Sequence, residues 1–519
     1  MRSIFSALIL SFLTLSVSAQ PIAEMVTTYR ADYGALDRKY DVEPSVEHFD
    51  RFDEFYVDWL QKLGDLDFEG LPRARQVDYL LFKNDLQRSA YFLNADRDRY
   101  NNISEFLPAT GEIMSFIHQR RVGNSMDGKE VASWFDNWNS AVHTKKAELE
   151  SHGLLAKREA AYLSDSIGEL KDGIEEAYEF YYGYDPDFTW WVEEPFKALN
   201  TSLEEYAEMA RVHFDAGKEA VDESGIVGNP IGEDEINRRL GFEMISYTPR
   251  ELIDIANEQY EWTFNEMLKA SRDLGYGDDW KAALEYVKTT HVPAGEQPPL
   301  VKELAEEAVM FLEDRELVTI PDLAKETWRM VMLSPEWQKF APFFLGGETV
   351  RIAYPTNTMT HEEKIMSMRG NNPHFSKAVV HHELIPGHHL QQFMNQRYEI
   401  HRRMFSTPFW TEGWALYWEF VLWEKGFPNN PEDKIGMLYW RMHRAARIIF
   451  SLNYHLGNWT PQESIDYLVD IKWDTNMRMR RQRSDVRLKA IMVRYTRLPT
   501  WWALCSSILC EWNWLIPAK

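Results

Sequence analysis

The pattern of apolar and polar positions along the chain is helical almost throughout. Apolar residues recur at spacings of three and four in Arg75–Leu93, Glu251–Ala270 and Lys302–Leu317, which places them on one face of an α-helix. The best candidate for a strand is Glu348–Tyr354, an alternating segment that ends at Pro355. The pattern therefore predicts a mainly α-helical fold with at most a small β element.

Turn-forming residues concentrate in two segments, 221–236 and 291–299. The second reads HVPAGEQPP and is the most linker-like stretch of the chain. We therefore expect an N-terminal helical lobe over residues 20–295 and a second helical lobe over residues 296–472.

The N-terminus has the features of a secretory signal peptide over residues 1–19. Arg2 precedes the apolar segment Ile4–Val17, and Val17-Ser18-Ala19 has the small residues of a cleavage site. We expect an exported protein, periplasmic or secreted, with no stable membrane insertion after cleavage. A segment retained as a membrane anchor is the alternative.

Composition narrows the classes of partner and of metal site. The formal net charge of −24 argues against nucleic acid as a partner. Cys505 and Cys510 are the two cysteines of the chain, so a disulfide framework is not expected. A metal site would have to use histidines and carboxylates, which favours zinc or a similar cation.

The segment Val380–Gln391 contains four histidines and one glutamate within nine residues. It resembles an HExxH zinc helix with two residues inserted. The residue one turn after His382 is Pro386, which cannot ligate a metal and which breaks the helical hydrogen bond to His382. If Pro386-Gly387 loop out, with Gly387 supplying the backbone freedom, His388 takes the position of the second ligand. We therefore expect His382 and His388 to bind one ion.

His389 is the substitute for His388, although on a straight helix it would lie about 10 Å from His382. The third ligand should be a carboxylate from a following helix, capped by Ser406-Thr407 and ending near Gly426. Glu412 is the first choice and Glu419, seven residues later on the same face, is the substitute.

The remaining chemistry follows from these ligands. Glu383 is the expected general base for the attacking water, as in zinc peptidases. His455 and Tyr417 are candidate donors to the oxyanion. The site thus predicts a single Zn²⁺ with Glu383, His455 and Tyr417 as catalytic residues.

The motif His382-Glu383-x-x-Pro386-Gly387-His388-His389-Leu390-Gln391, followed by Glu412-Gly413-Trp414-Ala415, resembles the bacterial family called domain of unknown function 885. The resemblance covers roughly residues 30–472. It implies a zinc-dependent peptidase whose fold is similar to the neurolysin-like and carboxypeptidase Taq-like helical metallopeptidases. That fold would have two helical lobes around a deep channel, which suits short peptides as substrates.

The character of the chain changes after Asp470. Residues 472–497 carry nine Lys or Arg against two Asp, and residues 498–516 read LPTWWALCSSILCEWNWLI. Codons that encode Trp473–Arg480 can, from their third base, also encode a Gly-His-Glu segment that the resembling family carries at this place. We therefore interpret residues 473–519 as an atypical tail, translated out of frame from about Lys472. Sequencing the coding DNA there tests this hypothesis.

Three functions remain open from the sequence. The first is zinc-dependent hydrolysis of short peptides. The second is metal or peptide binding without turnover, because the aberrant C-terminus would remove part of the catalytic machinery. The third is metal-dependent hydrolysis of a non-peptide ester or amide. The sequence indicates neither the oligomeric state nor the cleavage preference.

Overall fold

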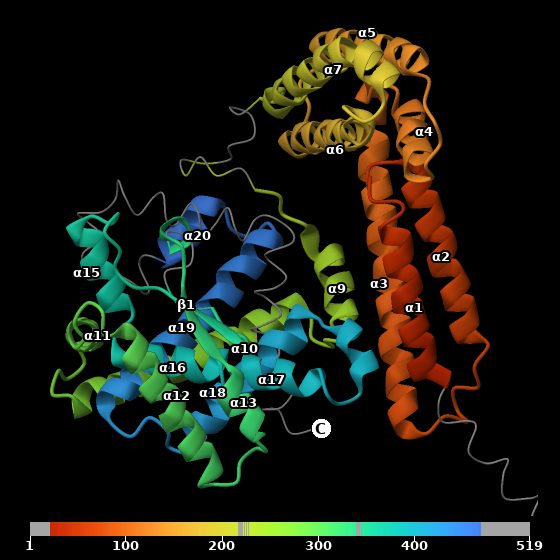
Figure 1. The fold of residues 1–519 in the computed structure, drawn as a ribbon. Coiled ribbons are helices and arrows are strands. Elements are labelled where there is room, and N and C mark those ends of the chain that lie inside the picture. Colours follow the sequence, from red (N-terminus) through yellow and green to blue (C-terminus); the bar gives the residue numbers. More distant parts are fainter. Residues whose placement is uncertain are drawn as a thin grey trace, which may run out of the picture. The chain divides into compact units, whose positions relative to one another are not determined.

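The computed structural model describes residues 21–215, 222, 224, 226, 228–338, 343 and 345–468. The predicted signal peptide (1–19) and the predicted aberrant tail (473–519) lie outside the described residues. The chain divides into two compact units, Met1–Glu219 and Ala220–Lys519, and each is described by itself (Figure 1).

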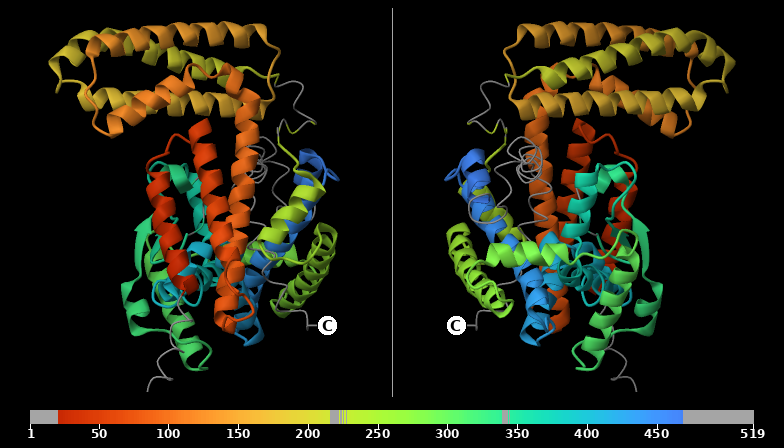
Figure 2. Two further views of the ribbon diagram at one scale, coloured as in Figure 1. Left: turned by 90° about the vertical axis from the view of Figure 1, so that its right-hand side faces the viewer. Right: turned by 90° about the vertical axis from the view of Figure 1, so that its left-hand side faces the viewer.

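The first unit is built from seven α-helices and one short 3-10 helix in its described part. Helix α2 packs beside α3, and α7 packs beside both α5 and α6. Figure 2 shows α5, α6 and α7 running alongside one another. The elements are α1 Pro21–Asp37, α2 Val46–Gly64, α3 Arg73–Ile103, η1 Ser104–Phe106, α4 Thr110–Arg121, α5 Gly128–Ser151, α6 Lys157–Tyr181 and α7 Pro186–Val212.

Local sequence explains where several of these helices begin. The Asp127 carboxylate accepts the backbone N–H groups of Lys129 and Glu130 at the start of α5. Asp185 caps α7 in the same way and is followed by Pro186, whose missing N–H costs nothing in a first turn. The predicted helix Arg75–Leu93 lies within α3.

The second unit holds the histidine cluster. Its elements are α9 Gly232–Phe242, α10 Pro249–Asp273, α11 Trp280–Thr289, α12 Gln297–Glu313, α13 Asp322–Thr327, β1 Arg329–Met332, α14 Pro335–Gln338, β2 Thr349–Ile352, α15 His361–Gly370, α16 Pro373–Glu383, α17 His388–Asn395, η2 Ile400–Phe405, α18 Pro408–Glu424, α19 Pro431–His455 and α20 Pro461–Leu468.

The division between the units falls at residues 219 and 220, well before the boundary at 295 that composition indicated. Helix α10 packs along α19, and α11 also contacts α19. Met267 and Leu284 share a buried apolar cluster with Leu438. Residues 249–289 therefore belong with the metal-site helices through contacts between segments that are distant in the sequence.

The predicted strand near Glu348 is β2, which pairs in parallel with β1; Arg329 lies opposite Thr349 and Met332 opposite Ile352. This pair is the sole sheet in the described part of the chain. The mainly α-helical fold is thereby confirmed. Val350 and Ile352 of β2 pack against α12 and against Val380 of α16, so the sheet covers one side of the metal-site helix.

Within the described residues, no helix combines the length and the apolar character that crossing a membrane requires.

Candidate metal centre

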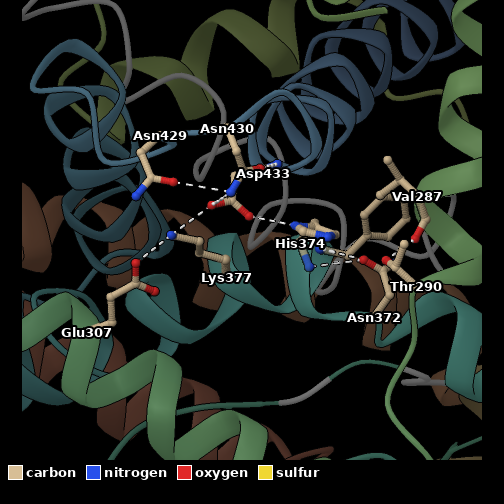
Figure 3. A network of polar contacts seen from close by, with 10 residues as sticks. Val287, Thr290, Glu307, Asn372, His374, Lys377, Asn429, Asn430 and Asp433 are labelled. Carbon is tan, nitrogen blue, oxygen red and sulfur yellow. Dashed lines mark hydrogen bonds and ion pairs between the residues drawn. The ribbon is translucent and has the colours of Figure 1, made fainter. Parts of the chain in front are cut away.

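The N-terminal half of α16 is held by a partly buried network of charges (Figure 3). The Asp433 carboxylate, at the start of α19, accepts His374 Nδ1–H at 2.6 Å and the Lys377 ammonium at 2.9 Å. Lys377 also donates to Glu307 of α12 at 2.7 Å. Because these side chains join three helices, they fix the position of α16 and with it the histidines at its C-terminal end.

Helix α16 ends at Glu383, and α17 begins only at His388. The Ile385–Pro386 peptide bond between them is cis. The indole N–H of Trp414 donates to the carbonyl oxygen of Pro386 at 2.7 Å. The predicted interruption at Pro386-Gly387 is therefore present, and it is fixed to α18.

Gly387 is required by a close approach of two backbone segments. A Cβ atom there would lie 1.7 Å from the carbonyl oxygen of His382, and the Gly387 N–H donates to the carbonyl of His381 at 3.0 Å. Its φ of −75° is accessible to every residue, so φ imposes no restriction of its own. Glycine allows the chain to turn back onto the end of α16.

This turn brings His382 and His388 together with Glu412 of α18. The Glu412 carboxylate oxygen lies 3.4 Å from His382 Nε2 and 3.6 Å from His388 Nε2. Zinc bonds of about 2.0–2.1 Å in a tetrahedron separate two ligand atoms by about 3.3 Å. The donor atoms and their spacing therefore fit a zinc ion, with the three residues first predicted as its ligands.

Glu419, the predicted substitute ligand, contacts the opposite side of the His382 ring. His382 Nδ1–H donates to Glu419 Oε1 at 2.7 Å, and Arg444 donates to Glu419 Oε2 at 2.6 Å. A carboxylate at Nδ1 leaves Nε2 free of its proton for a metal and orients the ring. Glu419 therefore positions His382, and Arg444 positions Glu419.

The charges around His382 favour a cation between His382, His388 and Glu412. Burial by itself lowers the pKa of His382, but its hydrogen bonds to Glu412 and Glu419 outweigh burial and raise that pKa to about 10. Burial raises the pKa of Glu412, yet the two histidines hold it well below its ordinary value. A bound cation would replace the proton that these carboxylates stabilise.

Glu383 is the second carboxylate close to the histidines. One of its oxygens lies within 4.8 Å of ligand atoms of both His382 and His388. The Gly346 N–H donates to this carboxylate, while burial raises its pKa. The Gly347 N–H donates to the Glu383 backbone carbonyl at 3.2 Å. These backbone contacts orient Glu383 beside the two histidines, close enough for its carboxylate to share a metal ion with them.

Gly346 leaves room for this orientation. A Cβ atom there would lie 2.4 Å from the Glu383 carboxylate oxygen Oε2. Gly346 and Arg444 are contributors that the sequence reasoning missed. The signal for Arg444 was an arginine between the apolar residues that helix Pro431–His455 buries. The close approach of Gly346 depends on contacts between distant segments.

The other two histidines of the cluster point elsewhere. His389 Nε2–H donates to the carbonyl oxygen of Ala324 in α13 at 2.8 Å. His381 is fully buried, its ring lies 5.7 Å from that of Phe427, and burial lowers its pKa to about 3. The structure thus pairs His388, and not His389, with His382.

The two predicted oxyanion donors, His455 and Tyr417, lie on different helices. His455 is the buried last residue of α19, and its ring contacts that of Tyr454. Tyr417 lies on α18, with its ring against Trp418, and is 37% exposed. Their catalytic roles stay predictions.

Comparison with known proteins identifies the family. The family model described as "Bacterial protein of unknown function (DUF885)" matches residues 25–483. The chain belongs to this family. The match includes every residue of the candidate metal centre and ends within the segment interpreted as aberrant. Among curated proteins, no match was found.

Two solved structures share the fold of this DUF885 protein. A "putative lipoprotein of unknown function" from Shewanella oneidensis aligns with a TM-score of 0.67 and 16% identity, over 95% of this chain and 92% of that one. A "putative lipoprotein" from Colwellia psychrerythraea aligns with a TM-score of 0.53 and 15% identity, over 94% and 91% of the two chains. At these identities the likeness concerns the fold alone.

Proposed function

We propose that this DUF885 protein is a zinc-dependent hydrolase that cleaves peptide bonds in short peptides. The observation that carries the proposal is the convergence of His382 and His388 on one oxygen of Glu412, at 3.4 and 3.6 Å, with Glu383 directly beside them. Two imidazoles, one carboxylate and an adjacent glutamate are the composition of a hydrolytic zinc site.

Each residue has a defined task in this proposal. His382, His388 and Glu412 would hold the ion. Zinc bound there supplies positive charge that polarises the scissile carbonyl and makes the attacking water more acidic. Glu383 accepts the proton of that water and passes it to the leaving amine. Its pKa, raised by burial, suits a group that must take up and release a proton.

Access to the site supports a catalytic role over a purely structural one. His382 and Glu419 are buried, whereas the Glu412 side chain is 34% exposed. A structural zinc site is closed by four protein ligands, while a catalytic site keeps one position open. Three ligands with an exposed side leave a position for water and substrate.

Substitution of Glu383 tests the proposal. We expect the purified protein to contain one zinc ion per chain and to hydrolyse members of a mixed peptide library. Glu383→Gln should retain zinc and lose about 10²–10⁴-fold in turnover, the range for loss of a general base. Glu424→Gln, an exposed position on α18, is the matched control. Absence of stoichiometric zinc, or unchanged turnover in Glu383→Gln, would refute the proposal.

A second candidate is a relative that binds zinc and peptides without turnover. It is favoured by the change in composition after Asp470 and by a family match that ends at residue 483 of 519. Stoichiometric zinc with no hydrolysis of the peptide library would support it. Restoring the alternative reading frame from Lys472 should then restore hydrolysis.

We further propose that the protein acts outside the cytoplasm. The N-terminal segment with Arg2 and Ile4–Val17 supports export, and both similar structures carry the description "putative lipoprotein". Short peptides are the proposed partners, and neither nucleic acid nor a stable membrane insertion is expected. Fractionation of cells that express the full chain tests this: recovery in the cytoplasm alone would contradict export.

A further inference from the structure

The end of the first unit where α6 passes into α7 carries a cluster of exposed aromatic side chains. Phe180 is 54% exposed, Tyr182 43%, Tyr184 84%, Trp190 81% and Trp191 43%. Single exposed aromatics are ordinary, but here five lie within twelve residues, on and beside one turn, which makes this segment a candidate binding surface. These five residues are called the aromatic surface below.

The turn that presents the aromatic surface is ordered by its own hydrogen bonds. The Thr189 hydroxyl donates to the carbonyl of Asp185 at 2.6 Å and accepts the N–H of Gly183 at 2.8 Å. The Tyr184 N–H donates to the carbonyl of Tyr181 at 3.1 Å. A ligand would therefore meet side chains on a prearranged scaffold, which lowers the entropic cost of binding.

The charge around the aromatic surface is net negative. Residues 172–196 include eight acidic residues and no Lys, Arg or His; the acids are Asp172, Glu175, Glu176, Glu179, Asp185, Asp187, Glu193 and Glu194. Three cations from outside the segment pair with five of these acids: Lys171 with Asp172 and Glu175, Arg120 with Glu176, and Lys197 with Glu193 and Glu194. The acids outnumber these partners, so the surface attracts positive charge.

Two rings of the aromatic surface already accept cations within the protein. The Lys129 ammonium lies 5.1 Å from the centre of the Trp191 ring, and the Arg120 guanidinium lies 5.5 Å from that of Phe180. Both distances are within the range of a cation–π contact. Trp190 and Tyr184, the most exposed rings, offer the same chemistry to a ligand from solution.

We propose that the aromatic surface binds cationic peptides in which Lys or Arg alternates with apolar side chains. The carboxylates and ring faces would take the cationic groups, and the ring edges would cover the apolar ones. An anionic membrane fits less well, because the net negative charge of this segment would oppose its headgroups. The proposal concerns the first unit and does not depend on hydrolysis in the second.

Fluorescence anisotropy of labelled peptides tests this surface. The probes are a short peptide of Lys, Leu and Gly, a matched peptide of Glu, Leu and Gly, and one of Lys, Ser and Gly. The full chain carries Glu383→Gln throughout, so that hydrolysis cannot consume the probe and a failure of the proposed catalysis cannot mask binding. The Lys–Leu peptide should bind most tightly and should weaken as salt is added.

The double variant Tyr184→Ala/Trp190→Ala should bind this peptide about tenfold more weakly, since two solvent-exposed cation–π contacts are lost. Both side chains are more than four-fifths exposed, so the fold should be unaffected. Trp337→Ala and Tyr398→Ala are matched controls, because they remove exposed aromatics of the second unit and should leave affinity unchanged. Equal binding of the Glu peptide, or unchanged affinity of the double variant, would overturn the proposal. So would binding to phosphatidylcholine vesicles through Tyr184 and Trp190 without peptide binding.

Discussion

Glu419 of α18 connects the candidate metal centre to the surrounding helices, because it contacts both His382 of α16 and Arg444 of α19. Its side chain is 8% exposed and joins His382 Nδ1 at 2.7 Å to Arg444 at 2.6 Å. Glu419→Gln keeps the shape of the side chain and removes its charge. The amide has one accepting oxygen and one donating NH2 group, so it cannot accept from both His382 Nδ1–H and Arg444, whose side chain is 17% exposed.

Glu419→Gln should lower both the affinity for zinc and the stability of the fold. Removal of a carboxylate that orients a metal-ligating histidine weakens metal binding about 10- to 100-fold, which corresponds to about 1.4–2.7 kcal/mol. Removal of one partner of a buried ion pair costs about 3–5 kcal/mol of stability. The metal-free variant should therefore unfold at clearly lower urea concentration than the metal-free wild type.

Competition between the protein and a chromogenic zinc chelator measures the affinity, and urea unfolding followed by circular dichroism measures the stability. Glu419→Asp, which keeps the charge on a shorter side chain, should fall between Glu419→Gln and the wild type. Glu424→Gln, exposed on the same helix, should match the wild type in both assays. If Glu419→Gln bound zinc within twofold of the wild type, the positioning role of Glu419 would be refuted.

Three further predictions test separate parts of the structure. Gly387→Ala places a Cβ 1.7 Å from a backbone oxygen and should lower the free energy of unfolding by about 3 kcal/mol or more in a urea titration. Gly370→Ala is the control, because its Cβ would meet a ring carbon at an ordinary 3.5 Å, and it should lower that free energy little. His389→Gln should retain stoichiometric zinc by elemental analysis, whereas His388→Gln should lose it, and the reverse result would exchange their roles. Burial raises the pKa of Asp85 in the first unit from 3.8 to about 6. The folded state therefore favours the protonated carboxyl group, and the stability that this group provides is lost as pH rises from about 4 to 6. Asp85→Asn should then stabilise the unit at pH 7, by about 3 kcal/mol at most, and leave stability near pH 4 unchanged; equal effects at both pH values would contradict the shift.

The helices of this chain were largely predictable because their signals are local. The pattern of Arg75–Leu93 lies within α3 Arg73–Ile103, and Glu251–Ala270 lies within α10 Pro249–Asp273. The second metal-site helix begins at Pro408 with Thr407 as its cap, as its sequence indicated. Capping and amphipathic spacing act within a few residues, so a single sequence contains them.

The division into units was less accessible to the sequence. The Pro- and Gly-rich stretch 291–299 resembles a linker, yet α11 before it and α12 after it both belong to the second unit. The pairing of α10 with α19 joins segments almost two hundred residues apart. Turn-forming residues report a local change of direction, and they do not report which helices pack together afterwards.

By itself, the sequence determined the donor set of the candidate metal centre: imidazoles and carboxylates without thiolates, and a helix that Pro386-Gly387 must interrupt. The tertiary structure decided how these groups are used. It turned His388 toward His382 and His389 toward Ala324, and it placed Glu412 and Glu419 on opposite sides of one imidazole. Residue types and spacing define which contacts are chemically possible, but the direction of each side chain depends on the packing of α16, α17, α18 and α19, which brings distant segments within hydrogen-bonding distance.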